Sequence, residues 1–214
     1  YIIGSNPKDF FDLTIESTKI LSKSDLIIFS KSFSRKYTNI LNYNTKNILY
    51  EEDLGSSKQA LWKKICELFN NHKIISHLIV GDPYLFFEND QEEFFLKKKI
   101  IVEKILGIPE IVNAINKKKY FLTNRNKNSS IIFFFPLTEK DCNKLLDFHE
   151  FEKLIIKIKS QPILSKVKKI FKNKKHSKLI YKFYVNGNEK KLFEKINLDK
   201  FKQNAYIILE NAKL

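Results

Sequence analysis

The chain has 214 residues, 43% of them hydrophobic, so it is long enough for one large or two small globular domains and is not a disordered protein. Its formal charge of +15 favours a polyanionic partner, but lysine and asparagine are abundant while arginine occurs only at Arg35 and Arg125, which is typical of A/T-rich coding drift on solvated faces. The apolar runs fall short of the roughly 18 residues that cross a bilayer, so we expect no membrane-spanning segment.

The first half of the chain alternates short β-branched runs with segments of helical periodicity. Strands are predicted at 1–3, 26–29, 47–50, 74–80 and 100–106, and helices after a cap at Asp12 or Thr14 and at 34–41, 58–70, 92–98 and 110–116. This alternation predicts a parallel sheet with right-handed crossovers. Because the chain begins as a strand, we expect no signal peptide before the fold.

The strand predicted at 74–80 ends abruptly at Gly81-Asp82-Pro83. Ligands of open α/β sheets bind beyond the carboxyl ends of the strands, so a site is expected here. Gly81 would allow a ligand to approach the backbone, and Pro83 would make the turn rigid. Taken alone, the tripeptide is more typical of an ordinary strand-to-helix turn, since an aspartate between glycine and proline stabilises turns unaided.

The second half predicts another α/β unit after a polar stretch at 117–128. Strands are expected at 130–135, 153–158, 179–185 and 205–209, helices at 138–146 and 162–171, and a turn at 186–188. We therefore expect two α/β domains, at 1–120 and 121–214.

The cysteine and histidine pattern indicates no metal site. Cys66 and Cys142 are isolated, which excludes a disulfide framework or zinc motif and fits a reducing, cytoplasmic compartment. The histidines are His72, His77, His149 and His176, and none shows metal-site spacing. No role is assigned to any of them.

Six ordered pieces of the chain form a more specific pattern. They read IIGSNPKDFFDLT, SKSDLIIFSK, GDPYLF followed by Glu92-Glu93, VEKILGIPEIVNAI, FLTNRNKNSSIIFF and AYIILENA. In this order and spacing they resemble the tetrapyrrole methylase family, and within it they are most similar to the uroporphyrinogen-III C-methyltransferases. The resemblance implies two α/β domains with mixed or parallel sheets around a cofactor cleft.

The resemblance also implies a function. The family transfers methyl groups from S-adenosyl-L-methionine to tetrapyrroles, so we expect conversion of uroporphyrinogen III to precorrin-2, for siroheme and cobalamin, by a homodimer. Such a transfer needs alignment of the reacting atoms and exclusion of water more than covalent catalysis.

Individual site residues follow from the same resemblance. Positions that match the family's cofactor contacts are Pro7, Val80, Gly81, Asp82, Leu85, Pro109, Glu110 and Ile156. Thr123 and Arg125 match the substrate side, where lysines and Arg125 would attract the carboxylates of uroporphyrinogen. Arg125 fits equally well as a structural tie to backbone carbonyls.

The chain departs from the family pattern at the positions of substrate chemistry. Ser30 stands where the family has an aspartate taken as a catalytic base, and Glu52 where it has a catalytic lysine. Ser30 is a poor base without a partner, and the acidic run 51–53 is more typical of a solvated edge. In the opening loop, Asn6 and Lys8 replace two glycines.

Three hypotheses therefore stay open. A tetrapyrrole C-methyltransferase is favoured by the G-D-P turn and by Glu92-Glu93. A ribosomal-RNA 2′-O-methyltransferase of the same fold is favoured by the net charge and by FSRKYTNIL at 33–41, but that branch carries a different turn in place of G-D-P. A relic that keeps the fold without the chemistry is favoured by Ser30, Glu52 and the lost glycines.

Overall fold

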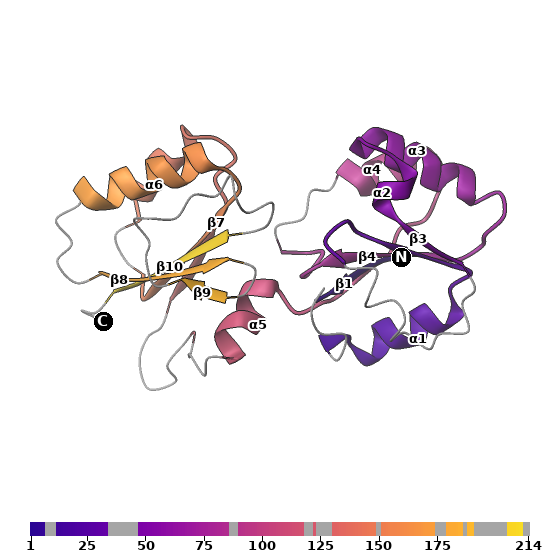
Figure 1. Cartoon of the computed structure of the whole chain (residues 1–214), viewed down its shortest axis with the longest axis horizontal. Helices are drawn as coiled ribbons and strands as arrows, with labels where there is room; N and C mark the ends of the chain where they lie inside the picture. The colour runs from indigo at the N-terminus through magenta and orange to yellow at the C-terminus, as the bar shows by residue number, and fades with distance from the viewer. Residues whose placement is uncertain are drawn as a thin grey trace. The chain divides into compact units, whose positions relative to one another are not determined.

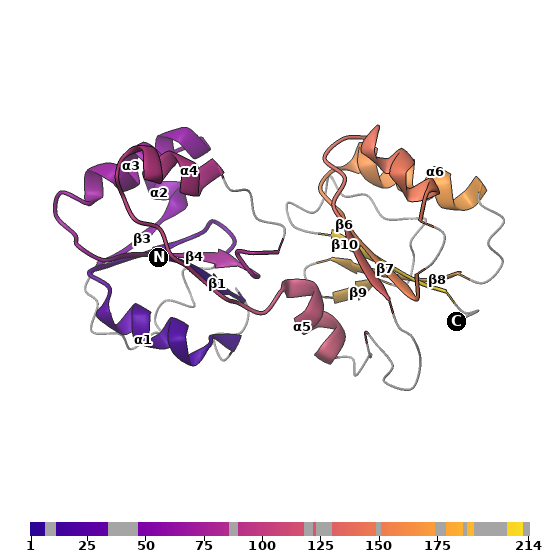
Figure 2. The same cartoon turned by 180° about the vertical axis from the view of Figure 1, so that it is seen from behind.

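A computed structural model of the chain describes residues 1–6, 12–33, 47–85, 90–117, 122, 130–148, 151–173, 179–185, 188–190 and 205–211. The chain divides into two compact units, Tyr1–Glu110 and Ile111–Leu214 (Figures 1 and 2). The boundary expected between residues 120 and 121 lies outside the described residues and stays a prediction.

The first unit is built on a five-stranded parallel sheet. Its strands are β1 (Ile2–Ser5), β2 (Leu26–Phe29), β3 (Ile48–Tyr50), β4 (Ile75–Val80) and β5 (Lys104–Ile105), in the order β3-β2-β4-β1-β5. All four pairings are parallel, as the alternating pattern predicts. The carboxyl ends of these strands therefore lie along one edge, which we call the carboxyl edge.

Helices cover both faces of this sheet, with α1 (Ile15–Lys23) on one face and α2 (Glu51–Leu54), α3 (Lys58–Leu68) and α4 (Asp90–Lys97) on the other (Figures 1 and 2). Hydroxyl caps start two of them. Thr14 Oγ1 accepts from Ser17 N at 3.1 Å and Ser57 Oγ from Ala60 N at 3.2 Å. Of the two caps considered for the first helix, Thr14 is correct.

The predicted strand at 100–106 is too long. Only Lys104–Ile105 pairs with β1, while Ile100 N donates to Phe95 O at 3.0 Å and closes the end of α4. Ile100 and Val102 pack against the core beneath α3 and α4. Their apolar character reflects this packing and not strand pairing. The helix predicted at 34–41 lies outside the described residues.

The second unit contains a mixed five-stranded sheet. Its strands are β6 (Ile131–Phe134), β7 (Lys153–Ile158), β8 (Leu179–Val185), β9 (Asn188–Lys190) and β10 (Ala205–Asn211), in the order β6-β7-β10-β8-β9. Only β6 and β7 are parallel. The helix α6 (Gln161–Asn173) and the 3₁₀-helix η3 (Asp141–Leu146) bury one face, and α5 (Glu110–Lys117) begins where the units divide. The expected class of two α/β domains with parallel and mixed sheets is confirmed.

The helix predicted at 138–146 is wrong in type and start. The Asp141 carboxylate accepts from Thr138 N at 2.8 Å, from Thr138 Oγ1 at 3.0 Å and from Leu137 N at 3.1 Å, and these bonds lower its pKa. The preceding backbone is thereby held in a turn, and a 3₁₀-helix begins only at Asp141.

No helix among the described residues is long and apolar enough to cross a membrane.

Candidate functional site

Three glycines meet at the carboxyl edge of the first sheet. A Cβ on Gly4 would lie 2.3 Å from Gly81 O and 2.7 Å from Gly107 Cα, and a Cβ on Gly107 would lie 2.3 Å from Gly81 O. Any side chain at Gly4 or Gly107 would therefore collide with backbone that has no rotamer to change. We call this contact of three backbones the glycine junction.

Gly81 needs glycine for a different reason. Its φ is +87°, a left-handed conformation that side chains disfavour, although a Cβ would meet Glu110 N and Pro109 Cα at an ordinary 3.7 and 3.9 Å. Gly81 N donates to Ser5 O at 2.8 Å, which fixes the turn against β1. The structure thus brings the predicted Val80–Gly81 turn next to the predicted Pro109–Glu110 segment.

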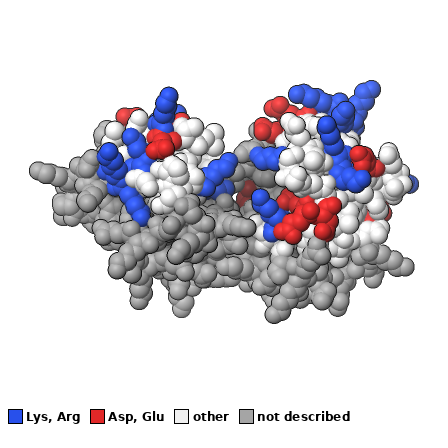
Figure 3. Space-filling view, turned by 45° about the horizontal axis from the view of Figure 1, so that its top comes forward, with Lys and Arg blue, Asp and Glu red and all other residues white. Residues whose placement is uncertain are grey.

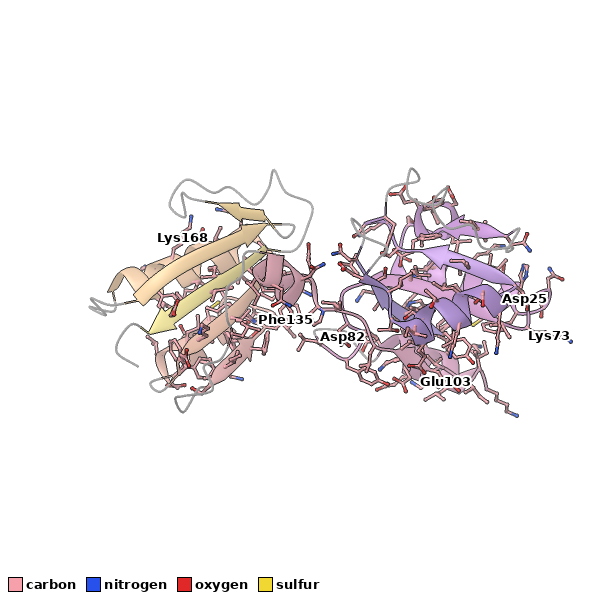
Figure 4. All side chains as sticks on the ribbon, turned by 90° about the horizontal axis from the view of Figure 1, so that it is seen from below. Asp25, Lys73, Asp82, Glu103, Phe135 and Lys168 are labelled. Carbon is pink, nitrogen blue, oxygen red and sulfur yellow. The ribbon has the colours of Figure 1, made fainter. Side chains whose placement is uncertain are left out.

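Asp82 stabilises its own turn. Its Oδ1 accepts from Tyr84 N at 2.7 Å and its carbonyl oxygen accepts from Leu85 N at 3.1 Å. Figure 4 shows Asp82 at one end of the first unit and Asp25 and Lys73 at the other, where Asp25 Oδ2 accepts from Lys73 N at 2.9 Å. Asp82, which the resemblance predicts as a cofactor contact, therefore also stabilises its own turn through this hydrogen bond.

Two buried hydroxyls lie at the same edge without partners. Ser5 closes β1 and Ser30 follows β2, they are 0% and 8% exposed, and neither Oγ has a hydrogen-bond partner among the described residues. A buried hydroxyl without a partner is costly, so a ligand that satisfies it gains free energy. Ser30 is also the residue that the sequence resemblance predicts at the family's catalytic aspartate position, which stays a prediction.

The acidic run after β3 divides in the structure. Glu52 and Asp53 are exposed on α2, as expected for a solvated edge. Glu51 instead accepts from His77 Nε2 at 2.8 Å and from Lys31 N at 3.0 Å. Burial alone would raise the pKa of Glu51, but the hydrogen bonds from His77 and Lys31 and the positive charge of Lys31 outweigh it, so the pKa is lowered.

His77, to which the sequence assigns no role, is the centre of a buried polar group. It is 5% exposed on β4, and its Nδ1 lies 3.2 Å from Gln91 Nε2 on α4. The histidine within an otherwise largely apolar strand is the sequence signal for this contact. That signal does not identify the partner, because Glu51 is 26 positions away.

The paired glutamates contribute one side chain to the region near the turn. Glu92 forms an ion pair with Lys104, whose Nζ lies 5.7 Å from the centre of the Tyr84 ring. The Tyr84 hydroxyl in turn donates to Lys104 O at 3.3 Å. These contacts tie the start of α4 to β5 beside the Gly81–Asp82 turn.

In the second unit the predicted adenine contact lies inside the core. Ile156 is 0% exposed and packs with the residues beneath α6, so its contact with cofactor stays a prediction. Near the ends of β6 and β7, Lys157 Nζ lies 5.1 Å and Lys159 Nζ 6.0 Å from the centre of the Phe135 ring (Phe135 is labelled in Figure 4). Two cations therefore gather around one aromatic ring.

Three predicted residues, Pro7, Thr123 and Arg125, lie outside the described residues. Among the residues that the structure describes, no group of three or more His, Cys, Asp or Glu side chains is arranged to hold a metal ion.

Part of the chain is similar in sequence to known methyltransferases. A uroporphyrinogen-III C-methyltransferase of Bacillus subtilis is 27% identical over 142 residues and one of Methanocaldococcus jannaschii 25% identical over 117 residues, which is 62% and 53% of this chain. The matched parts span about half of those relatives, 53% and 48%. No family model matches the chain.

Solved structures give the fold over nearly the whole chain. A uroporphyrin-III C-methyltransferase of Thermus thermophilus complexed with S-adenosyl homocysteine superimposes with a TM-score of 0.69 at 15% identity, covering 97% of this chain and 95% of that one. A cobalt precorrin-4 methyltransferase gives 0.68 at 15% identity, covering 98% and 93%. The chain is similar to tetrapyrrole methylases in sequence over part of its length and in fold over nearly all of it. The glycine junction and the Gly81 turn thus lie on a tetrapyrrole methylase fold.

Proposed function

We propose that the chain is an S-adenosyl-L-methionine-dependent C-methyltransferase that acts on a tetrapyrrole, converting uroporphyrinogen III to precorrin-2 in siroheme and cobalamin biosynthesis. The observation that carries the proposal is the glycine junction beside the buried, unpartnered Ser5 hydroxyl. The names of the sequence relatives and structural neighbours support the same class of reaction.

The residues at the carboxyl edge fit the cofactor. At Gly81 the left-handed backbone lies next to the Pro109–Glu110 segment, and Ser5 Oγ offers a buried hydroxyl. Val80, Gly81, Asp82, Leu85, Pro109 and Glu110 would hold the cofactor there, with Pro7 and Ile156 as further predicted contacts. When bound, S-adenosyl-L-methionine supplies an electrophilic methyl group on a sulfonium. The chain's task is then to orient the acceptor carbon and exclude water.

The proposed acceptor is a polycarboxylate, for which the second unit by itself offers a suitable group of side chains. Lys157 and Lys159 beside Phe135 combine positive charge with an aromatic face, which suits a carboxylate-bearing macrocycle. Arg125 and Thr123 stay proposed substrate residues. Ser30 is proposed to hydrogen-bond a pyrrole nitrogen and Glu52 to accept the proton that leaves the methylated product.

Titration calorimetry with S-adenosylhomocysteine tests the cofactor site. We expect micromolar binding by the purified chain and no detectable binding by Gly81→Val, in which the left-handed turn is strained, with weaker binding by Asp82→Ala. Glu67→Gln, on the exposed Lys64–Glu67 pair of α3, is the matched control and should bind normally. No binding by a folded wild-type chain would refute the proposal and leave the relic hypothesis.

An anaerobic methylation assay with uroporphyrinogen III then tests the acceptor. Methylation of ribosomal RNA instead would establish the alternative branch. The ribosomal-RNA alternative is not favoured, because acidic side chains lie among the lysines of both units on the face in Figure 3. The segment 33–41, which favours that alternative, lies outside the described residues from residue 34 on. A homodimer in the cytoplasm belongs to the same proposal, and sedimentation measures the oligomeric state.

A further inference from the structure

A chain of hydrogen bonds, buried at Gln91 and His77 and exposed at the Lys31 amide, crosses the first unit near its carboxyl edge. It runs from Gln91 on α4 to His77 on β4, then to Glu51 at the start of α2, and ends at the Lys31 amide after β2. The exposed side-chain fractions of His77 and Glu51 are 6% and 19%. We call these three side chains the Glu51–His77–Gln91 network.

The donor and acceptor roles in the network are consistent with one tautomer. Gln91 Nε2 is a donor, so His77 Nδ1 accepts at 3.2 Å and the imidazole proton lies on Nε2. That proton is donated to Glu51 Oε1 at 2.8 Å, while Oε2 accepts from Lys31 N at 3.0 Å. Both imidazole nitrogens and both carboxylate oxygens are therefore engaged. Because all four atoms are already hydrogen-bonded, the network is suited to holding the backbone in place and not to exchanging a proton with a substrate.

The parts that it holds are those where this chain departs from the family pattern. Lys31 directly follows Ser30, and Glu51 directly precedes Glu52. Ser30 itself is fixed through its backbone, with its N–H donating to Leu78 O at 3.0 Å, while its hydroxyl has no partner among the described residues. The network thus fixes the ends of β2 and β3 to β4.

We infer that Glu51, His77 and Gln91 are positioning residues, which hold Ser30 and the start of α2 in place for the acceptor substrate. This inference rests on the proposed function. The charged Glu51 carboxylate strengthens both of its hydrogen bonds, and removal of Glu51 or Gln91 would leave a nitrogen of the buried His77 ring unsatisfied. Loss of the network should therefore loosen the segment after β2 while the glycine junction, built from backbone on β1, β4 and β5, keeps its shape.

The test uses the full chain with two variants and a matched control. Glu51→Gln keeps the shape but removes the charge and one acceptor. Gln91→Leu removes the donor to His77, and a leucine suits the site because Gln91 borders a small cavity of about 30 Å³ lined mainly by apolar side chains. The control is Ser76→Ala. Ser76 precedes His77 on β4, and the substitution breaks its buried 2.6 Å hydrogen bond to the Ser24 hydroxyl.

Three measurements are made on each variant: amide hydrogen exchange of the peptide 30–33, S-adenosylhomocysteine affinity, and kcat and KM for methylation of uroporphyrinogen III. For Glu51→Gln and Gln91→Leu we expect exchange of the Lys31 amide about tenfold faster and kcat/KM for the acceptor about tenfold lower, with cofactor affinity within about twofold. Ser76→Ala should lower stability but leave all three unchanged.

The outcomes separate the inference from the function on which it rests. Unchanged exchange at 30–33 in both network variants would overturn the positioning role. Faster exchange with unchanged kcat/KM would reduce the network to a purely structural one and also overturn the inference. A folded wild-type chain that binds cofactor but methylates no tetrapyrrole would overturn the proposed function, and with it the acceptor role of the network, even if the exchange results were as expected.

Discussion

The carboxyl edge of the first sheet has two halves that are held together by different means. Around β1, β4 and β5 the backbone at the strand ends packs directly against itself at Gly4, Gly81 and Gly107. Around β2 and β3 the chain ends are tied by side chains, through the Glu51–His77–Gln91 network. The sequence resemblance covers the Gly81-Asp82-Pro83 turn in the first half, with departures at Asn6 and Lys8, and it predicts departures at Ser30 and Glu52 in the second. A site at this edge therefore combines a turn fixed by backbone contact with strand ends held by side chains.

The largest effect that would separate the two halves is expected for Gly107→Ala. Its Cβ would lie 2.3 Å from Gly81 O, so a strand end must move. We expect a loss of about 3 kcal/mol in the free energy of unfolding and no measurable S-adenosylhomocysteine binding. Denaturant titration and calorimetry measure these two quantities. A variant as stable as wild type would show that the junction is less tightly packed than described.

A smaller and pH-dependent effect is expected for Glu51→Gln, in the other half. The pKa of Glu51 is lowered in the folded chain below its ordinary value of 4.5, so its contribution to stability is fully present above that value and is lost as the pH falls through the lowered pKa. We expect the variant to be about 2 kcal/mol less stable than wild type at pH 7, with the difference shrinking in acid. Urea titrations from pH 7 to 3 measure it, and a difference independent of pH would contradict the assignment.

The smallest effect is expected for Ser5→Ala and has the opposite sign on stability. Because Ser5 Oγ is buried without a partner among the described residues, its removal should raise the free energy of unfolding by up to about 1 kcal/mol. If the hydroxyl meets the cofactor, affinity for S-adenosylhomocysteine falls at the same time. Thermal unfolding and calorimetry on one sample measure both. A gain in stability without a loss of affinity would place the cofactor elsewhere.

Much of the fold follows from local patterns. The runs 26–29 and 153–158 are predicted with their observed bounds because each is a short apolar segment between polar breaks. The turn after β4 is predicted because glycine, aspartate and proline each have a specific preference there. The strand at 100–106 is overextended because apolar residues beneath a helix look like those within a strand.

The site is less predictable because its contacts join distant segments. His77 contacts Glu51 and Gln91 only because the order β3-β2-β4 and the return of α4 place them together. No spacing rule along the chain encodes that contact. The unpartnered hydroxyls of Ser5 and Ser30 are likewise recognisable only once the burial of each strand end is known.

The glycine junction has a consequence for how this chain can change by mutation. Of its five glycines, three lie at this one contact. Since each neighbour there is backbone, no second-site side chain can be trimmed to make room for a substitution, and the positions are constrained together. Side-chain hydrogen bonds such as those of Glu51 can instead be replaced one residue at a time, and a second substitution can restore part of the stability that the first one loses. Mutational drift can therefore alter the side-chain ties around β2 and β3 gradually, while the three-glycine contact admits almost no intermediate steps.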